Sequence, residues 1–196
     1  ERPDLVINII DASNLERNLY LTMQLIEMQI PMVIAVNMMD VAHKKGIILH
    51  IEKLQKTLGI PVVPLIARNH VGLELLKDVL IQKHPISNFD VYHDYQNLLT
   101  PILPILSPLS KEISHQWVAL RLLEQDCFTK NHIIATANIK QSDIKGISNS
   151  QIEVSTIRYQ MIHRIIDATV DRKKVKRHKM TEILDSVCMN KYLGIP

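Results

Sequence analysis

The sequence predicts an α/β fold of parallel strands and helices, followed by an all-helical segment. Two observations carry this prediction. Short apolar runs alternate with amphipathic stretches through the first 84 residues, whereas only amphipathic stretches follow. The aromatic content changes at nearly the same place, because Tyr20 is the only aromatic residue in the first 88 positions and seven more occur in the remaining 108.

Three apolar runs predict the strands of the α/β part, and three amphipathic stretches predict its helices. The strands are expected at 5–10, 31–36 and 60–66, and the helices at 15–28, 46–58 and 73–82. The run at 5–10 is nearly all apolar, which is typical of a strand covered on both faces. Ser13 or Asn14 is the expected N-cap of the first helix, and Gly59 is expected to end the second. The alternation predicts a parallel sheet with right-handed crossovers.

The all-helical segment is expected to begin after a linker at 84–88. Helical spacing of apolar residues recurs at 112–125, 151–170 and 180–193, and no strand is predicted here. Trp117 is the largest apolar side chain of this segment and shares a helical face with Ile113 and Leu120, so it is the expected core anchor.

Residues 98–110 fit no single regular element. Thr100 suits an N-cap and Pro101 suits the first helical position, but Pro104 and Pro108 would interrupt a helix that starts there. Their conformation is therefore left open.

Composition excludes several classes of protein. The 196 residues carry a net charge of +3, of which residues 171–179 contribute +5, so the rest is at about −2 and the protein is no uniformly basic nucleic-acid coat. No apolar run approaches the ~18 residues of a membrane span, and the N-terminal residues do not resemble a signal peptide. Cys127 and Cys188 form no CxxC pair, and the nine histidines are scattered. We therefore expect no disulfide framework, metal site or catalytic constellation within these residues.

The five glycines exclude two kinds of phosphate-binding loop. They lie at least 13 residues apart, whereas GxxxxGK[ST] and GxGxxG each need glycines two to five positions apart. Any nucleotide phosphate site must therefore lie outside these residues.

The run Asn37-Met38-Met39-Asp40 directly follows the second predicted strand. Ligands of open α/β sheets bind beyond the carboxyl ends of the strands. A carboxylate there can accept hydrogen bonds from both N1–H and the exocyclic amine of guanine, and Asn37 can donate to the base. A helix N-cap is the structural alternative for the same pattern. After the third strand, Ala67 offers a backbone N–H that is expected to meet the guanine O6.

The chain resembles the ferrous iron transport protein B family over nearly its whole length. The resemblance rests on the run Asp11-Ala12-Ser13-Asn14-Leu15-Glu16-Arg17-Asn18-Leu19-Tyr20-Leu21-Thr22, on Asn37-Met38-Met39-Asp40 and on residues 60–75. It extends to Trp117-Val118-Ala119-Leu120-Arg121-Leu122-Leu123-Glu124, Arg158-Tyr159-Gln160-Met161-Ile162, Thr181-Glu182-Ile183-Leu184-Asp185 and Leu193-Gly194-Ile195-Pro196.

The resemblance implies a fold, a set of domains and a nucleotide site. Residues 1–84 would be the C-terminal part of a small-GTPase-like parallel sheet domain, 85–180 a helical regulatory domain, and 181–196 a helix leading to the first membrane span. The nucleotide-binding residues implied are Asn37, Met38, Met39, Asp40, Ile66, Ala67 and Arg68. Ile66 departs from the family, which often has Ser there, so any hydroxyl contact at this position is lost.

The family's phosphate loop, first switch and DxxG element would all precede Glu1, so the chain is interpreted as a fragment without GTPase activity of its own. The DxxG run at 143–146 lies after the specificity loop and is taken as coincidence. The ligands implied are GTP or GDP with Mg²⁺, whose phosphate and metal contacts lie outside this chain. Fe²⁺ would be the transported ion and would not bind here. The location implied is the cytoplasmic face of the bacterial inner membrane.

Two interpretations remain open at this point, beside a weaker third, a ribosome- or RNA-associated GTPase, which only the basic run at 171–179 suggests. In the first, the chain is the guanine-recognising part of a GTPase, coupled through helices to the transmembrane region of the same protein; a homo-oligomer is compatible with it. In the second, it is a non-catalytic helical coupling module with a vestigial nucleotide fold. The basic run at 171–179 suits anionic lipid or a plain solvated loop better than nucleic acid, since no aromatic residues are interleaved.

Overall fold

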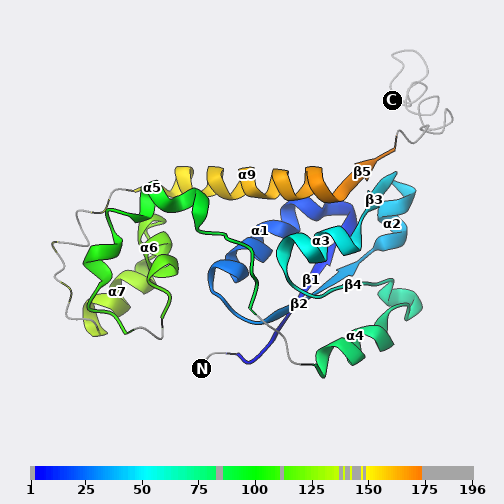
Figure 1. Cartoon of the computed structure of the whole chain (residues 1–196), viewed down its shortest axis with the longest axis horizontal. Coiled ribbons are helices and arrows are strands. Elements are labelled where there is room, and N and C mark those ends of the chain that lie inside the picture. Colours follow the sequence, from blue (N-terminus) through cyan, green and yellow to red (C-terminus); the bar gives the residue numbers. More distant parts are fainter. Residues whose placement is uncertain are drawn as a thin grey trace, which may run out of the picture.

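The computed structural model describes residues 3–82, 86–110, 113–136, 139, 142, 147 and 149–173. Figure 1 shows an α/β unit, a group of short helices beside it, and one long helix, α9 (Gln151–Thr169), that lies along both. The helix predicted at 180–193, the segment 181–196 and the DxxG run at 143–146 lie outside the described residues, as does most of the basic run.

The α/β unit is built on a parallel sheet of three strands in the order β1-β2-β4. The strands are β1 (Val6–Asp11), β2 (Met32–Asn37) and β4 (Val62–Pro64). β2 is central, and its residues from Met32 to Val36 are all buried, which explains their uninterrupted apolar sequence. The three predicted strands and their parallel pairing are thus confirmed, although β4 is shorter than 60–66.

The prediction that the first strand is covered on both faces is wrong. Ile7 and Ile9 are 45% and 67% exposed, whereas Asn8 and Ile10 on the opposite face are buried. Side chains alternate between the two faces of a strand. One face of β1 therefore packs on the core, and the other face, with Ile7 and Ile9, is only partly covered by the residues that the structure describes.

Helices cover the two faces of the sheet in separate layers (Figure 1). One face packs against α1 (Leu15–Glu27) and α3 (Ile51–Leu58), and the other packs against α4 (Leu73–Leu80). Gly59 ends α3 in the left-handed conformation, as predicted, with φ of 62°. Asn14 occupies the N-cap position of α1 without a side-chain cap bond.

The helix predicted at 46–58 is in fact a strand followed by a helix. β3 (Ile47–Leu49) pairs antiparallel with β5 (Val170–Arg172), and only then does α3 begin. The prediction of no strand after the linker is therefore also wrong, and α9 ends at Thr169. Ile47 and Ile48 are β-branched, which favours a strand, but the partner strand lies more than 120 residues away and gives no local signal. The α2 helix (Met39–Lys44) connects β2 to β3.

The region left open at 98–110 forms short turns of helix. Between the linker and α6 lie η3 (His93–Tyr95), α5 (Gln96–Leu99) and η4 (Leu103–Leu106). Thr100 ends α5 and does not start a helix, and Pro104 sits in the first turn of η4, where its missing N–H costs nothing. The prolines thus set the breaks between these short elements.

Two further helices of the described ranges, α6 (His115–Leu123) and α7 (Cys127–Thr136), lie beside the first turns of α9 (Figure 1). Trp117 is only partly buried and Ile113 is 38% exposed, so the prediction that Trp117 anchors the core is wrong. The fully buried face of α6 instead carries Val118, Ala119, Leu120, Leu122 and Leu123. A one-residue rotation of the assumed helical face accounts for the error.

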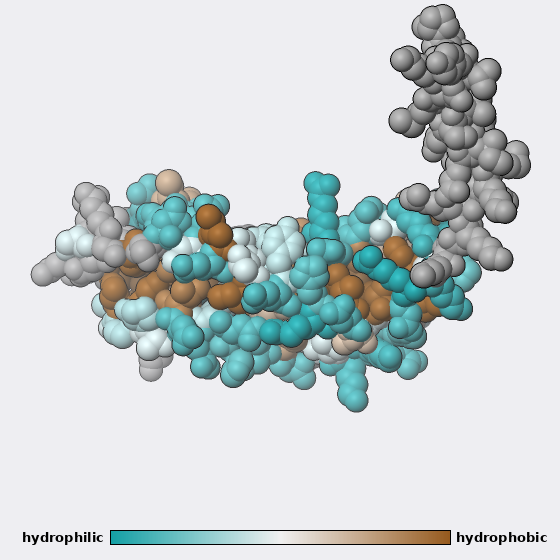
Figure 2. Space-filling view, turned by 90° about the horizontal axis from the view of Figure 1, so that it is seen from above, coloured by the Kyte–Doolittle hydropathy of each residue, from teal (hydrophilic) through white to brown (hydrophobic). Residues whose placement is uncertain are grey.

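One hydrophobic core runs from the sheet into the helical segment. Buried residues of α1, α3, α6 and α9 belong to the same cluster, and α9 packs against each of the other three helices. Seen from the α9 side, the surface is mainly hydrophilic with separate apolar patches toward both ends (Figure 2). Within the described ranges, no helix combines the length and the apolar character needed to cross a bilayer.

Candidate functional site

The candidate site lies at the carboxyl edge of the sheet, where β1 and β2 end side by side. Asp11 and Asn37 are the last residues of these strands and are paired in register. The chain leaves β2 through Met38, which is left-handed with φ of 63°, and enters α2 at Met39. This turn places Asp40 in the first turn of α2, with its side chain 18% exposed.

A second loop, residues 66–71, closes on itself beside the first one. The backbone N–H of Ile66 donates to the Val71 carbonyl, and the Val71 N–H donates to the Ile66 carbonyl. Gly72 follows with φ of 85°, and a Cβ there would lie 2.3 Å from the Pro64 carbonyl oxygen. Only glycine suits this position, so the loop is held in one tight conformation.

Three polar contacts join the two loops. The Ala67 backbone N–H donates to Oδ1 of Asn37 at 3.1 Å, and the Met39 N–H donates to the Leu65 carbonyl at 3.4 Å. Nη2 of Arg68 lies 2.6 Å from Oδ2 of Asp40 and forms an ion pair with it. The structure therefore brings Asn37, Asp40, Ala67 and Arg68 together, as expected of a single site.

The other predicted residues take different places around these four. Met38 is 40% exposed and Met39 is partly buried against the core. Ile66 takes part through its backbone in the loop closure. The Ala67 N–H, which the sequence suggested for a guanine O6, donates to Asn37 in this structure.

The turn after β1 supports the site from the side. The Asp11 carboxylate accepts from the Ser13 backbone N–H at 2.7 Å and from Nδ2 of Asn14 at 2.9 Å. Burial opposes its ionisation, but these hydrogen bonds and the nearby Lys45 lower the pKa of Asp11 overall. Lys45 also donates from Nζ to Oγ of Ser13 at 3.2 Å, which ties the end of α2 to this turn.

The chemistry of the four central residues suits the edge of a guanine base. Asp40 offers carboxylate oxygens as acceptors at the edge of the sheet, where its side chain is 18% exposed and Oδ2 is paired with Arg68. Because Oδ1 of Asn37 is used by the Ala67 N–H, its Nδ2 remains a donor suited to a ring nitrogen. Among the described residues, no group of three or more His, Cys, Asp or Glu side chains could hold a metal ion.

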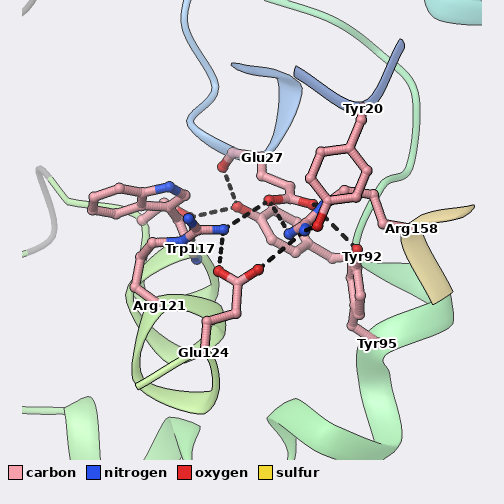
Figure 3. A network of polar contacts seen from close by, with 9 residues as sticks. Tyr20, Glu27, Tyr92, Tyr95, Trp117, Arg121, Glu124 and Arg158 are labelled. Atoms are coloured by element: carbon pink, nitrogen blue, oxygen red, sulfur yellow. Dashed lines mark hydrogen bonds and ion pairs between the residues drawn. The ribbon is translucent and has the colours of Figure 1, made fainter. Parts of the chain in front are cut away.

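A second polar cluster, which the sequence analysis missed, lies between the α/β unit and the helical segment (Figure 3). Glu27 and Arg158 are both fully buried, and two bonds of 2.8 and 2.9 Å join the guanidinium to both carboxylate oxygens. Arg158 also donates to Glu124 at 3.0 Å and to the Tyr20 hydroxyl at 2.7 Å. We call these four residues, with Tyr92, Tyr95 and Arg121, the Glu27 network.

The Glu27 network joins four segments that are distant in sequence. Glu27 ends α1, Arg158 lies in α9 and Glu124 caps α6, while Tyr95 from η3 donates to Oε1 of Glu27 at 3.2 Å. The Tyr92 hydroxyl donates to the Glu27 backbone carbonyl. Arg121 contacts Glu124 and lies 3.6 Å from Glu27, so two cations and two anions balance within the cluster.

The cluster shifts the proton equilibria of its members. Burial raises the pKa of the Tyr92 phenol to about 12 and raises that of Tyr95 further, with the nearby Glu27 acting in the same direction. Burial disfavours the charged form of Arg158, but its hydrogen bonds to Glu27 outweigh this and raise its pKa. Both phenols therefore stay neutral and Arg158 stays charged near neutral pH.

Comparison with known proteins decides the family. A sequence profile described as "Ferrous iron transport protein B" matches residues 1–80. The solved cytosolic domain of L. pneumophila FeoB has a TM-score of 0.73 and 31% identity, covering 88% of this chain and 70% of that one. The chain belongs to the FeoB family.

Other FeoB proteins agree with this assignment. A GDP-bound mutant of the S. thermophilus FeoB G-domain has a TM-score of 0.74 and 29% identity, covering 87% of this chain and 71% of that one. The Fe(2+) transporters FeoB of Salmonella typhimurium and Escherichia coli K12 are each 32% identical over 98% of this chain. The chain spans about a quarter, 26%, of the length of these curated FeoB relatives.

Proposed function

We propose that this chain recognises the guanine base in the cytosolic GTP-binding region of a ferrous iron transporter. The observation that carries the proposal is the pairing of two loops at the carboxyl edge of the sheet, which places Asn37 and Asp40 beside Ala67 and Arg68. The Asp40 carboxylate would accept from guanine N1–H and from the exocyclic amine, and Asn37 would donate from Nδ2 to the base. The GDP-bound state of the S. thermophilus relative supports a guanine nucleotide as the ligand.

In this proposal the remaining nucleotide contacts come from other residues. The phosphates and Mg²⁺ need a phosphate loop and metal-binding hydroxyl that these 196 residues do not contain. Ferrous iron is the cargo of the complete protein and does not bind here. The protein would work at the cytoplasmic face of the bacterial inner membrane, with its own transmembrane region as partner and the basic residues at 171–179 facing anionic lipid.

We further propose that the helical segment relays nucleotide state toward the membrane region. Two features support a relay. The α9 helix packs against helices of both the α/β unit and the helical segment, and β5, which follows α9, pairs with β3, which follows the helix α2 that carries Asp40. Leu120→Ala, which removes a fully buried side chain of α6, is expected to loosen the helical segment and reduce Fe²⁺ uptake while GTP affinity stays unchanged. Normal iron-dependent growth with a demonstrably loosened helical segment would rule out a mechanical relay.

The guanine assignment is tested by exchanging the acceptor in the complete protein. Asp40→Asn is expected to cost several kcal/mol of GTP affinity, at ~1.5–3 kcal/mol for each charge-assisted hydrogen bond, and to shift preference toward xanthine nucleotides, because Asn donates where Asp only accepts. Asn37→Ala is the matched control, which should weaken binding without a xanthine shift. Unchanged GTP affinity in Asp40→Asn would remove Asp40 from the base pocket.

A further inference from the structure

Arg68 forms an ion pair with the Asp40 carboxylate, the group that the guanine base is expected to need. Nη2 of Arg68 lies 2.6 Å from Oδ2 of Asp40, and the Arg68 side chain is 64% exposed while that of Asp40 is 18% exposed. The cation extends from a loop that is fixed by the Ile66–Val71 closure and by the Ala67 contact to Asn37. Arg68 is thus attached to a rigid base beside Asp40, with its head group accessible to solvent.

The Arg68 head group and the recognition edge of guanine have the same donor chemistry. In both, two neighbouring nitrogens on one carbon carry N–H groups that point the same way, and both match a carboxylate. Compared with the guanidinium group, guanine has in addition its fused rings and the carbonyl group. A carboxylate arranged to accept from one of these groups therefore also accepts from the other.

We infer that Arg68 is an intramolecular competitor of guanine for Asp40 and so lowers the affinity for guanine nucleotides. The inference rests on the proposed function. The base needs both carboxylate oxygens, so Arg68 has to release Oδ2 before the base can engage fully. The binding-competent form is only part of the population, and the apparent dissociation constant rises by the inverse of that fraction.

The strength of the ion pair sets the size of the effect. Pairs with an exposed member are weak, so Arg68→Ala is expected to tighten GDP binding roughly 1.5- to 5-fold. Salt screens such a pair, so the advantage of Arg68→Ala over wild type should shrink as ionic strength rises. A cation that simply attracted the nucleotide phosphates would give the opposite sign, with weaker binding after its removal.

The test measures GDP dissociation constants of the complete protein at low and high salt. Lys77→Ala is the matched control, because Lys77 is an exposed cation paired 2.7 Å from Glu74 on α4 and its removal changes the net charge equally. Arg68→Ala should tighten GDP binding, and Lys77→Ala should not. Weaker or unchanged GDP binding in Arg68→Ala would overturn the competition.

A second arm separates competition from a structural effect of Arg68. With Asp40→Asn, Arg68 has no carboxylate to hold, so adding Arg68→Ala should leave the affinity for xanthosine diphosphate unchanged. A further gain in this background would show that Arg68 acts elsewhere and would also overturn the inference. If Asp40→Asn binds guanine and xanthine nucleotides as wild type does, the proposed function itself fails. If Asp40→Asn switches its preference to xanthine nucleotides but Arg68→Ala does not tighten GDP binding, only the inference that Arg68 competes with guanine fails.

Discussion

Replacing Arg158 with Met tests whether the Glu27 network holds the two halves of the chain together. The substitution keeps an unbranched side chain but leaves the fully buried Glu27 carboxylate without the cation that now contacts both of its oxygens. Tyr95 at 3.2 Å and Arg121 at 3.6 Å would remain as its neighbours. Removing one partner of a buried pair costs ~3–5 kcal/mol, which is a large share of the ~5–15 kcal/mol that stabilise a typical domain.

This cost is measured by urea unfolding of the cytosolic region, prepared with the same boundaries as in the solved relatives. Arg158→Met should lower the midpoint without changing the slope, since the surface exposed on unfolding stays similar. Arg164→Met is the matched control on the same helix, because Arg164 is 62% exposed and pairs with Asp94 at the surface. An exposed pair is worth ~0.2–1 kcal/mol, so this control should change stability little.

The double variant Glu27→Leu/Arg158→Met gives the decisive comparison. Replacing both members of a buried pair with apolar side chains is often neutral or stabilising. The double variant should therefore lose less stability than Arg158→Met alone, although Tyr95 loses its acceptor. The reasoning would be refuted if the double variant lost as much free energy of unfolding as Glu27→Leu and Arg158→Met lose together when measured singly. A loss below ~1 kcal/mol for Arg158→Met alone would also refute it.

Three further outcomes are expected. The isolated 196-residue chain should bind GTP weakly and hydrolyse none, since it contains no GxxxxGK[ST] run, and micromolar affinity in calorimetry would contradict this. The free energy of unfolding should fall as pH rises from about 10, the ordinary tyrosine pKa, to about 12, the raised pKa of Tyr92, because the unfolded chain loses this proton first. In unfolding curves measured at alkaline pH, Tyr92→Phe should make this decline less steep. Leu120→Ala should cost about 2–5 kcal/mol in urea unfolding and Trp117→Ala less, since only Leu120 is fully buried, and the reverse ranking would contradict the observed packing.

The sequence was informative wherever a local pattern decides the structure. Five consecutive buried residues in β2 form an unbroken apolar run, and Gly59 ends α3 as its position suggested. The loop at 37–40 was correctly located after a buried strand, and its closeness to 66–68 followed from the rule that carboxyl ends of parallel strands share one edge.

Long-range pairing was beyond the reach of the local pattern. β3 exists because β5 lies opposite it, and Ile47 pairs with Arg172 across more than 120 positions. The exposure of Ile7 and Ile9 likewise depends on which segments cover β1, which an apolar run does not reveal. The face predicted for α6 is wrong because Trp117, although large, is only partly buried, while neighbouring residues of the helix fill the core.

The Glu27 network did leave a signal that was overlooked. Glu27 continues the buried spacing of Leu19 and Met23 in α1, and Arg158 lies between Val154 and Ile162 in the buried stripe of α9. A single charge inside an apolar stripe is expensive to bury unless it has a partner. Two such stripes with opposite charges therefore predict an ion pair between the helices.

The most direct test of guanine recognition by Asp40 is the ratio of the dissociation constants for inosine diphosphate and GDP. Inosine lacks the exocyclic amine, so the complete wild-type protein should bind its diphosphate roughly 10- to 150-fold more weakly, as expected for one lost hydrogen bond of ~1.5–3 kcal/mol to a carboxylate. In Asp40→Asn the ratio should fall close to one. Equal affinities in wild type, or an unchanged ratio in Asp40→Asn, would contradict the account.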